Sequence, residues 1–146
     1  MLNEIYFTSF EQTGNNRLDV NFGFCSVEVN TNNETIVMLK RIKDIKPFYD
    51  ETIEFTLHTK LIMSKEGGTP TLFGFYTKDE LTYFNRLILV QGIGTKLAIQ
   101  IMDYATKKEF EYLVSAKLAE ELCKLKGIGI QTSKKIVRSY KLKGDL

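Results

Sequence analysis

Two short glycine turns carry the residues best suited to bind an anion. Residues 90–94 and 125–129 both read apolar, polar, Gly, Ile, Gly, and the two copies lie 35 positions apart. Glycine allows a positive φ and lets another backbone approach without a Cβ between them. The first amides of a helix after such a turn have no intrahelical partner and carry the positive end of its dipole, so they suit a phosphate. The glycines concerned are Gly92, Gly94, Gly127 and Gly129.

Basic residues follow both turns. Lys96 follows the first, and Lys134, Lys135 and Arg138 follow the second. Because phosphate contacts need no reading of bases, this arrangement predicts an interface for a nucleic-acid backbone. For either copy alone, the turn could be only the tight connection of a helical hairpin, with its isoleucine packed beneath it. The repetition, with basic residues after both copies, favours the DNA-binding interpretation.

Capping signals indicate where the helices around these turns begin. Thr77 with Glu80, and Thr106 with Glu109, have the spacing of capping boxes, and Ser115 is placed to cap a further helix. Together with apolar residues at helical spacing, these signals predict five short helices after residue 76. The fourth and fifth of these are expected at residues 116–124 and 130–141.

The first half of the chain alternates apolar and polar residues. The alternation is rich in β-branched and aromatic side chains, which indicates antiparallel strands, and we expect residues 35–39 to form one of them. Five or six strands in about 75 residues predict a small closed barrel, most commonly a five-stranded OB-fold. The predicted fold class is therefore all-β plus all-α in two domains, with the barrel at residues 1–76 and the helices at 77–146.

Charge is distributed unevenly between the two halves. Residues 1–77 hold 7 Lys/Arg and 10 Asp/Glu, a net charge of −3, whereas residues 78–146 hold 13 and 8, a net charge of +5. The half that bears the glycine turns is thus the basic one, as expected for the part that binds a nucleic acid.

The sequence offers few residues for catalysis or metal binding. Cys25 and Cys123 are far apart, and His58 is the only histidine, so histidine metal sites and catalytic triads lack their parts. The first glycine turn also lacks the spacing of an ATPase phosphate loop. We therefore expect no catalytic residue, no metal and no cofactor. With no apolar run near the roughly 18 residues of a membrane span and no signal-peptide pattern, we expect a cytoplasmic protein without membrane contact.

The order of these features along the chain is specific. A barrel-like segment leads through residues 72–75 to Glu80 and Phe84, and then to the glycine turns within residues 90–98 and 125–132. In this order the whole chain resembles the RuvA family, the bacterial proteins that bind Holliday junctions during branch migration. The resemblance implies an OB-fold domain and two helix-hairpin-helix motifs, assembled as a homotetramer around a four-way DNA junction.

The resemblance also assigns roles to individual residues. It implies that the glycines and basic residues named above contact phosphates along the duplex arms, and it adds Thr132 to the candidate DNA-binding residues. Family members present an acidic pin on a barrel loop near the crossover, and the matching loop here, residues 64–70, has one carboxylate, Glu66. Lysines usually follow the second turn directly in the family, but Ile130 and Gln131 stand there in this chain.

The expected partners are four-way junction and duplex DNA. The family also recruits the hexameric ATPase RuvB through a small third domain, to which any helicase activity would belong. Because the sequence stops at Leu146, we expect this chain alone not to engage that motor in the usual way. The leading hypothesis is a non-catalytic, sequence-independent junction-binding subunit that acts in homologous recombination and DNA repair.

Two alternatives stay open. One is a double-stranded DNA-binding scaffold without junction preference. The other is a fragment of a helix-hairpin-helix glycosylase or nuclease, but such an enzyme needs a base-flipping pocket and a positioned catalytic Asp or Lys, and no motif in the sequence marks Asp103 as that residue.

Overall fold

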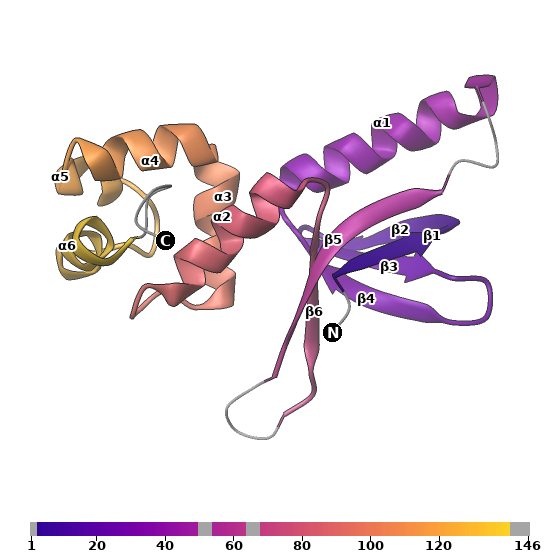
Figure 1. The fold of residues 1–146 in the computed structure, drawn as a ribbon, viewed down its shortest axis with the longest axis horizontal. Coiled ribbons are helices and arrows are strands. Elements are labelled where there is room, and N and C mark those ends of the chain that lie inside the picture. Colours follow the sequence, from indigo (N-terminus) through magenta and orange to yellow (C-terminus); the bar gives the residue numbers. More distant parts are fainter. Residues whose placement is uncertain (1–2, 50–53, 64–67, 141–146) are drawn as a thin grey trace. The chain divides into compact units, whose positions relative to one another are not determined.

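The chain folds into two compact units, Met1–Leu81 and Thr82–Leu146. The computed structural model describes residues 3–49, 54–63 and 68–140 (Figure 1). The first unit contains a sheet and a long helix, and the second contains helices and the two glycine turns.

A mixed six-stranded sheet forms the frame of the first unit. Its strands are β1 (Glu4–Phe7), β2 (Ser9–Gly14), β3 (Arg17–Asn21), β4 (Ser26–Asn30), β5 (Phe55–Ile62) and β6 (Thr71–Phe75). They lie in the order β1-β5-β6-β4-β3-β2, and all neighbours are antiparallel except β4 and β6, which are parallel. The strands at the two ends of this order, β1 and β2, are separated in the chain only by Thr8.

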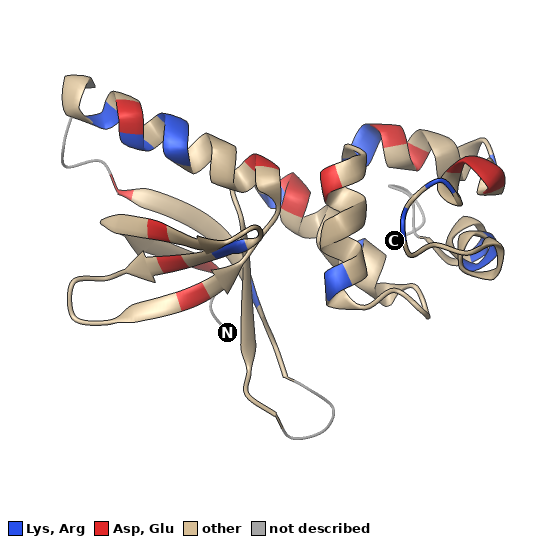
Figure 2. Ribbon diagram, turned by 180° about the vertical axis from the view of Figure 1, so that it is seen from behind, with Lys and Arg blue, Asp and Glu red and all other residues tan. Residues whose placement is uncertain are grey.

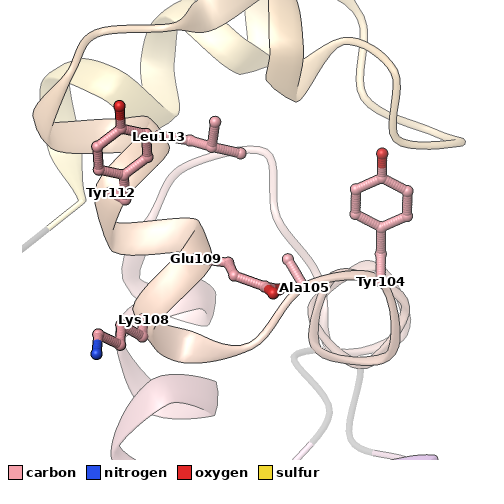
Figure 3. Close-up of a pocket in the computed structure, with 6 residues that line it drawn as sticks. All are labelled: Tyr104, Ala105, Lys108, Glu109, Tyr112 and Leu113. Atoms are coloured by element: carbon pink, nitrogen blue, oxygen red, sulfur yellow. The ribbon is translucent and has the colours of Figure 1, made fainter.

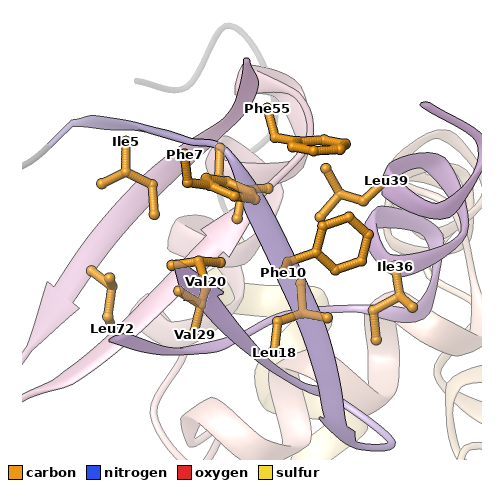
Figure 4. Packing of buried hydrophobic residues seen from close by; sticks show 11 residues of the cluster. Ile5, Phe7, Phe10, Leu18, Val20, Val29, Ile36, Leu39, Phe55 and Leu72 are labelled. Carbon is orange, nitrogen blue, oxygen red and sulfur yellow. The ribbon is translucent and has the colours of Figure 1, made fainter. Parts of the chain in front are cut away.

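Alternation along the strands directs apolar side chains into one core. Phe7 stacks on Phe55 with ring centroids 5.5 Å apart, and Phe10 meets Phe55 edge-on at 5.2 Å (Figure 4). Ile36 and Leu39 of helix α1 (Asn33–Tyr49) belong to the same buried cluster. The helix therefore completes the core that the sheet begins.

Helix α1 corrects the prediction that residues 35–39 form a strand, and with it the prediction that the first domain is all-β. The β-branched residues in this segment favour a strand locally. However, the Asn32 side chain accepts a hydrogen bond from the Thr35 amide at 3.2 Å, which caps the helix start. Ile36 and Leu39 are buried at a spacing of three, so burial follows the helical period.

A partly buried polar cluster joins the start of α1 to the start of α2 (Lys78–Leu89). The Glu80 carboxylate accepts hydrogen bonds from Asn32 Nδ2 at 3.1 Å and from Thr35 Oγ1 at 3.2 Å. Burial raises the pKa of Glu80, and the neighbouring Glu34 raises it further, while the two hydrogen bonds oppose the shift. The Glu80 amide donates to Thr77 Oγ1 at 3.2 Å, which confirms Thr77 as the N-cap of α2.

The second unit continues α2 and adds four helices. These are α3 (Thr95–Tyr104), α4 (Lys107–Ser115), α5 (Ala119–Leu122) and α6 (Ile130–Ser139). The predicted capping box at the start of α4 is confirmed, since Thr106 and Glu109 exchange both hydrogen bonds. The prediction that Ser115 caps the next helix is wrong, because α4 runs through Ser115 and α5 begins only after Leu118.

Buried contacts hold these helices together. Arg86 on α2 is only 6% exposed and pairs with Glu111 on α4 at 3.0 Å, and the Tyr140 hydroxyl donates to the same carboxylate at 3.3 Å. Burial and the Glu111 carboxylate raise the pKa of Tyr140 well above its usual range. The pair thereby links α2, α4 and the end of α6 inside the second unit.

Candidate DNA-binding turns

The two glycine turns have the same backbone conformation. Gly92 and Gly127 have φ of +96° and +91°, in the left-handed region that favours glycine. Gly94 and Gly129 have φ/ψ of −85°/177° and −86°/174°, and they are the N-caps of α3 and α6. The sequence repeat is therefore also a repeat of structure.

The turns bury their isoleucines and expose their glycines. Ile93 and Ile128 are 5% and 4% exposed, whereas the four turn glycines lie on the surface. In each turn the isoleucine amide donates to the carbonyl three residues earlier, at 3.1 Å. The isoleucine thus packs the turn onto the helices, as the hairpin-only alternative requires, and at the same time the glycines remain accessible to a ligand.

The packing around Gly94 and Gly129 leaves room for a side chain at both positions. A Cβ built on either residue meets no atom within 4 Å, and the backbone at both is extended, which any residue adopts. Neither helix start receives a hydrogen bond from a capping side chain. The first amides of α3 and α6 thus have no capping side chain, and the Cβ positions beside them are open, as a phosphate acceptor requires.

Gly127 differs because it also contacts the first motif. A Cβ at this position would lie 3.3 Å from Cδ1 of Leu97 on α3. This close approach and the positive φ give Gly127 a structural reason to be glycine. The contact also packs the second turn against the helix that follows the first.

The basic candidates are exposed, but they sit differently in the two motifs. Lys96 is the second residue of α3, directly beyond its N-cap. The corresponding first turn of α6 holds Ile130, which is 45% exposed, and Gln131. Thr132, which is half-buried, follows Gln131. The basic residues of α6 come later in the helix, which carries blue in Figure 2: Lys134, Lys135 and Arg138.

These cations are available to an external anion. Among the described residues, the ion pairs of Arg86 with Glu111 and of Lys124 with Glu121 lie away from the candidate cations, and neither involves Lys96, Lys134, Lys135 or Arg138. Arg138 Nε donates only a long hydrogen bond of 3.4 Å to the Lys134 carbonyl. Three exposed cations thus lie on the helix that follows the second glycine turn.

The start of α6 is anchored from inside the unit. The fully buried Ser133 donates from its hydroxyl to the Ile130 carbonyl at 2.8 Å, and its oxygen lies 3.1 Å from the Cys123 sulfur. These contacts fix the first turn of the helix, so its amides keep one direction. The role of Cys123 as a packed neighbour of Ser133 had no signal in the sequence.

The acidic pin candidate, Glu66, lies outside the described residues. Among the residues that are described, no group of three or more His, Cys, Asp or Glu side chains could hold a metal ion. No described helix has both the length and the apolar character needed to cross a membrane.

One apolar hollow in the second unit was not predicted. It has a volume of about 600 Å³ and lies between the end of α3 and α4 (Figure 3). Tyr104 and Tyr112, which are 57% and 66% exposed, line it together with Leu113. It contains none of the predicted DNA-binding residues, so it is separate from the glycine turns.

Comparison with curated proteins finds relatives that share one name, "Holliday junction branch migration complex subunit RuvA". The relative from Actinobacillus succinogenes is 34% identical over 88 residues, which are 60% of this chain and 42% of the relative. The one from Clostridium acetobutylicum is 33% identical over 70 residues, 48% of this chain and 35% of the relative. The one from Pseudomonas savastanoi pv. phaseolicola is 33% identical over 95 residues, which are 65% of this chain and 45% of the relative.

The chain therefore matches less than half the length of these relatives. No protein-family model matches it. The chain is nevertheless RuvA-like in sequence over as much as 65% of its length.

Proposed function

We propose that this chain binds four-way DNA junctions, independently of base sequence, as the junction-binding subunit of a RuvA-type branch-migration complex. The observation that carries the proposal is the pair of exposed glycine N-caps of α3 and α6, Gly94 and Gly129, which have no atom within 4 Å of a built Cβ and no capping side chain. The relatives' shared name supports a Holliday junction as the DNA structure that is bound.

Each motif would hold one phosphate group. In the first motif the amides of Thr95 and Lys96 point toward the anion and the Lys96 ammonium adds a charge close by. In the second motif the amides act with Lys134 and Lys135, which lie about one turn further along the helix. Such contacts carry no sequence information, so DNA is free to move through them during branch migration.

The first unit is proposed to be an OB-fold. If β1 and β2 are one strand interrupted at Thr8, the order of strands closes on itself and gives a five-stranded barrel. We propose that this barrel assembles four copies around the junction as a homotetramer. The domain division near residue 76, the pin role of Glu66 and a cytoplasmic location belong to the same proposal.

The proposed role is non-catalytic, and ATP hydrolysis is assigned to a separate motor, RuvB. The alternative role as a duplex-binding scaffold shares the same phosphate contacts but lacks junction preference. The relatives' name favours the junction.

A competition experiment tests the proposal. A labelled immobile four-way junction is bound by the full chain and then challenged with unlabelled linear duplex of the same sequences and total length. We expect the unlabelled junction to displace the labelled one at a concentration at least about tenfold lower than the duplex, because only the junction presents several arms at once. Equal displacement by both would contradict junction binding and favour the scaffold, and no binding to either DNA would exclude both roles.

A further inference from the structure

The outer face of α1 carries an apolar stripe that no described residue of the first unit covers. Val37, Ile45 and Phe48 are 46%, 51% and 85% exposed, at spacings of eight and three residues along one side of the helix. The inner face is used for the core, through Ile36 and Leu39. Three large apolar side chains on one exposed helix face are the pattern of a protein-binding surface.

Two opposite charges complete this face. Arg41 and Asp44 lie between Val37 and Phe48 at helical spacing, and both are exposed. Within the described part of the chain neither forms an ion pair. We call these five residues the outer stripe: Val37, Arg41, Asp44, Ile45 and Phe48.

The outer stripe is complementary to itself. When two copies of α1 pack antiparallel about a twofold axis, Val37 of one copy meets Phe48 of the other, and Arg41 meets Asp44. Both kinds of contact then occur twice. A purely acidic or purely basic partner would instead leave one of the two charges facing a like charge or no charge.

We propose that the outer stripe of α1 binds the outer stripe of a second copy of this chain in this antiparallel arrangement. Val37 and Phe48 are 11 residues apart, so the contact spans about 16 Å. A contact between two single helices of this length falls well short of the about 1,600 Å² of a stable interface, so it is weak alone and depends on concentration. Where each assembly already contains several copies, several of these contacts form at once and join one assembly to another.

This self-association uses only residues of the first unit and does not depend on the proposed DNA binding. Disulfide trapping tests its geometry. In a Cys25→Ser background, which removes the exposed native thiol, the double variant V37C/F48C is oxidised and run on a denaturing gel. A disulfide within one chain is excluded, because the two positions are about 16 Å apart and a disulfide needs Cα atoms within about 7 Å.

We expect the double variant to form at least about tenfold more covalent dimer than V37C or F48C alone, because the twofold axis places position 37 of one copy opposite position 48 of the other. Dimer yields no higher than those of the single variants would overturn the proposed contact. Equal yields from V37C alone would indicate a parallel arrangement and would equally overturn it.

Charge exchange tests the ion pairs. Light scattering over a range of concentrations measures self-association of R41D, D44R and R41D/D44R, with K108D in the second unit as a control for the charge change of R41D. We expect each outer-stripe single variant to weaken association at least about tenfold and the double exchange to restore it to within about threefold of the wild type. Failure of the double variant to recover, with unchanged helical circular dichroism, would refute the pairing. Junction affinity of the same variants, measured separately, reports on the proposed function.

Discussion

The structure predicts that a serine at Gly94 or Gly129 preserves the fold and weakens DNA binding. Both positions are N-caps with extended backbone and no neighbouring atom within 4 Å of a built Cβ. Serine is a better N-cap than glycine by a few tenths of a kcal/mol, so G94S and G129S should fold at least as stably as the wild type. The serine hydroxyl also accepts from the second or third helix amide, which is one of the donors that a phosphate would use.

The expected loss follows from the contact that serine removes. A hydrogen bond to a charged acceptor contributes about 1.5–3 kcal/mol, so loss of one contact lowers affinity by about 10- to 150-fold. G94A separates the two effects, because alanine adds the Cβ without an acceptor. A smaller loss for G94A than for G94S would assign the difference to competition for the amides.

The assay is fluorescence anisotropy with a labelled four-way junction at fixed salt, together with thermal unfolding of each variant. If G94S and G129S unfold at or above the wild-type temperature and bind the junction as tightly as the wild type, the reasoning that open glycine caps receive phosphates is wrong. If either variant unfolds at a lower temperature than the wild type, the prediction that serine at these N-caps preserves stability is contradicted.

Three further outcomes follow from particular side chains. Lys96→Ala should reduce the slope of log affinity against log salt by about 0.9, since one phosphate contact is lost, whereas Lys108→Ala on α4 should leave the slope unchanged. Gln131→Lys should raise junction affinity about fivefold, because a cation about 4 Å from a phosphate in water contributes about 1 kcal/mol. An unchanged affinity in the same titration would show that the phosphate does not lie near the first turn of α6. Glu111→Ala should lower the free energy of unfolding by about 3 kcal/mol, because its partner Arg86 is left buried and unpaired. Glu121→Ala, which breaks an exposed pair, should lower it by less than about 1 kcal/mol. Equal effects of the two variants in urea titrations would contradict the importance of burial.

Local signals in the sequence predicted the elements that hold the glycine turns. The capping box of Thr106 and Glu109 involves residues three positions apart, so it depends on no distant contact and is confirmed. The two turns likewise have matching backbones because their isoleucines bury in the same way. That they contact DNA stays a prediction, because contact with a ligand is a property of the complex.

The main errors arose where tertiary contacts outweigh local preference. Residues 35–39 are rich in β-branched side chains, yet α1 forms because Asn32 caps it and because the core accepts Ile36 and Leu39 at helical spacing. Ser115 has a capping side chain, but its hydroxyl donates to the Tyr112 carbonyl and α4 continues through it. The hollow beside Tyr104 could not be predicted, because it depends on how α3 and α4 meet.

The most direct test of the central claim is to follow backbone amide resonances of the isotope-labelled chain during titration with a short duplex. If the glycine turns receive phosphates, the largest shifts will occur at the first amides of the two helices that follow them: Thr95, Lys96, Ile130 and Gln131. If these four amide resonances stay unchanged while others shift, at DNA concentrations that saturate binding, the claim that the glycine turns receive phosphates is contradicted.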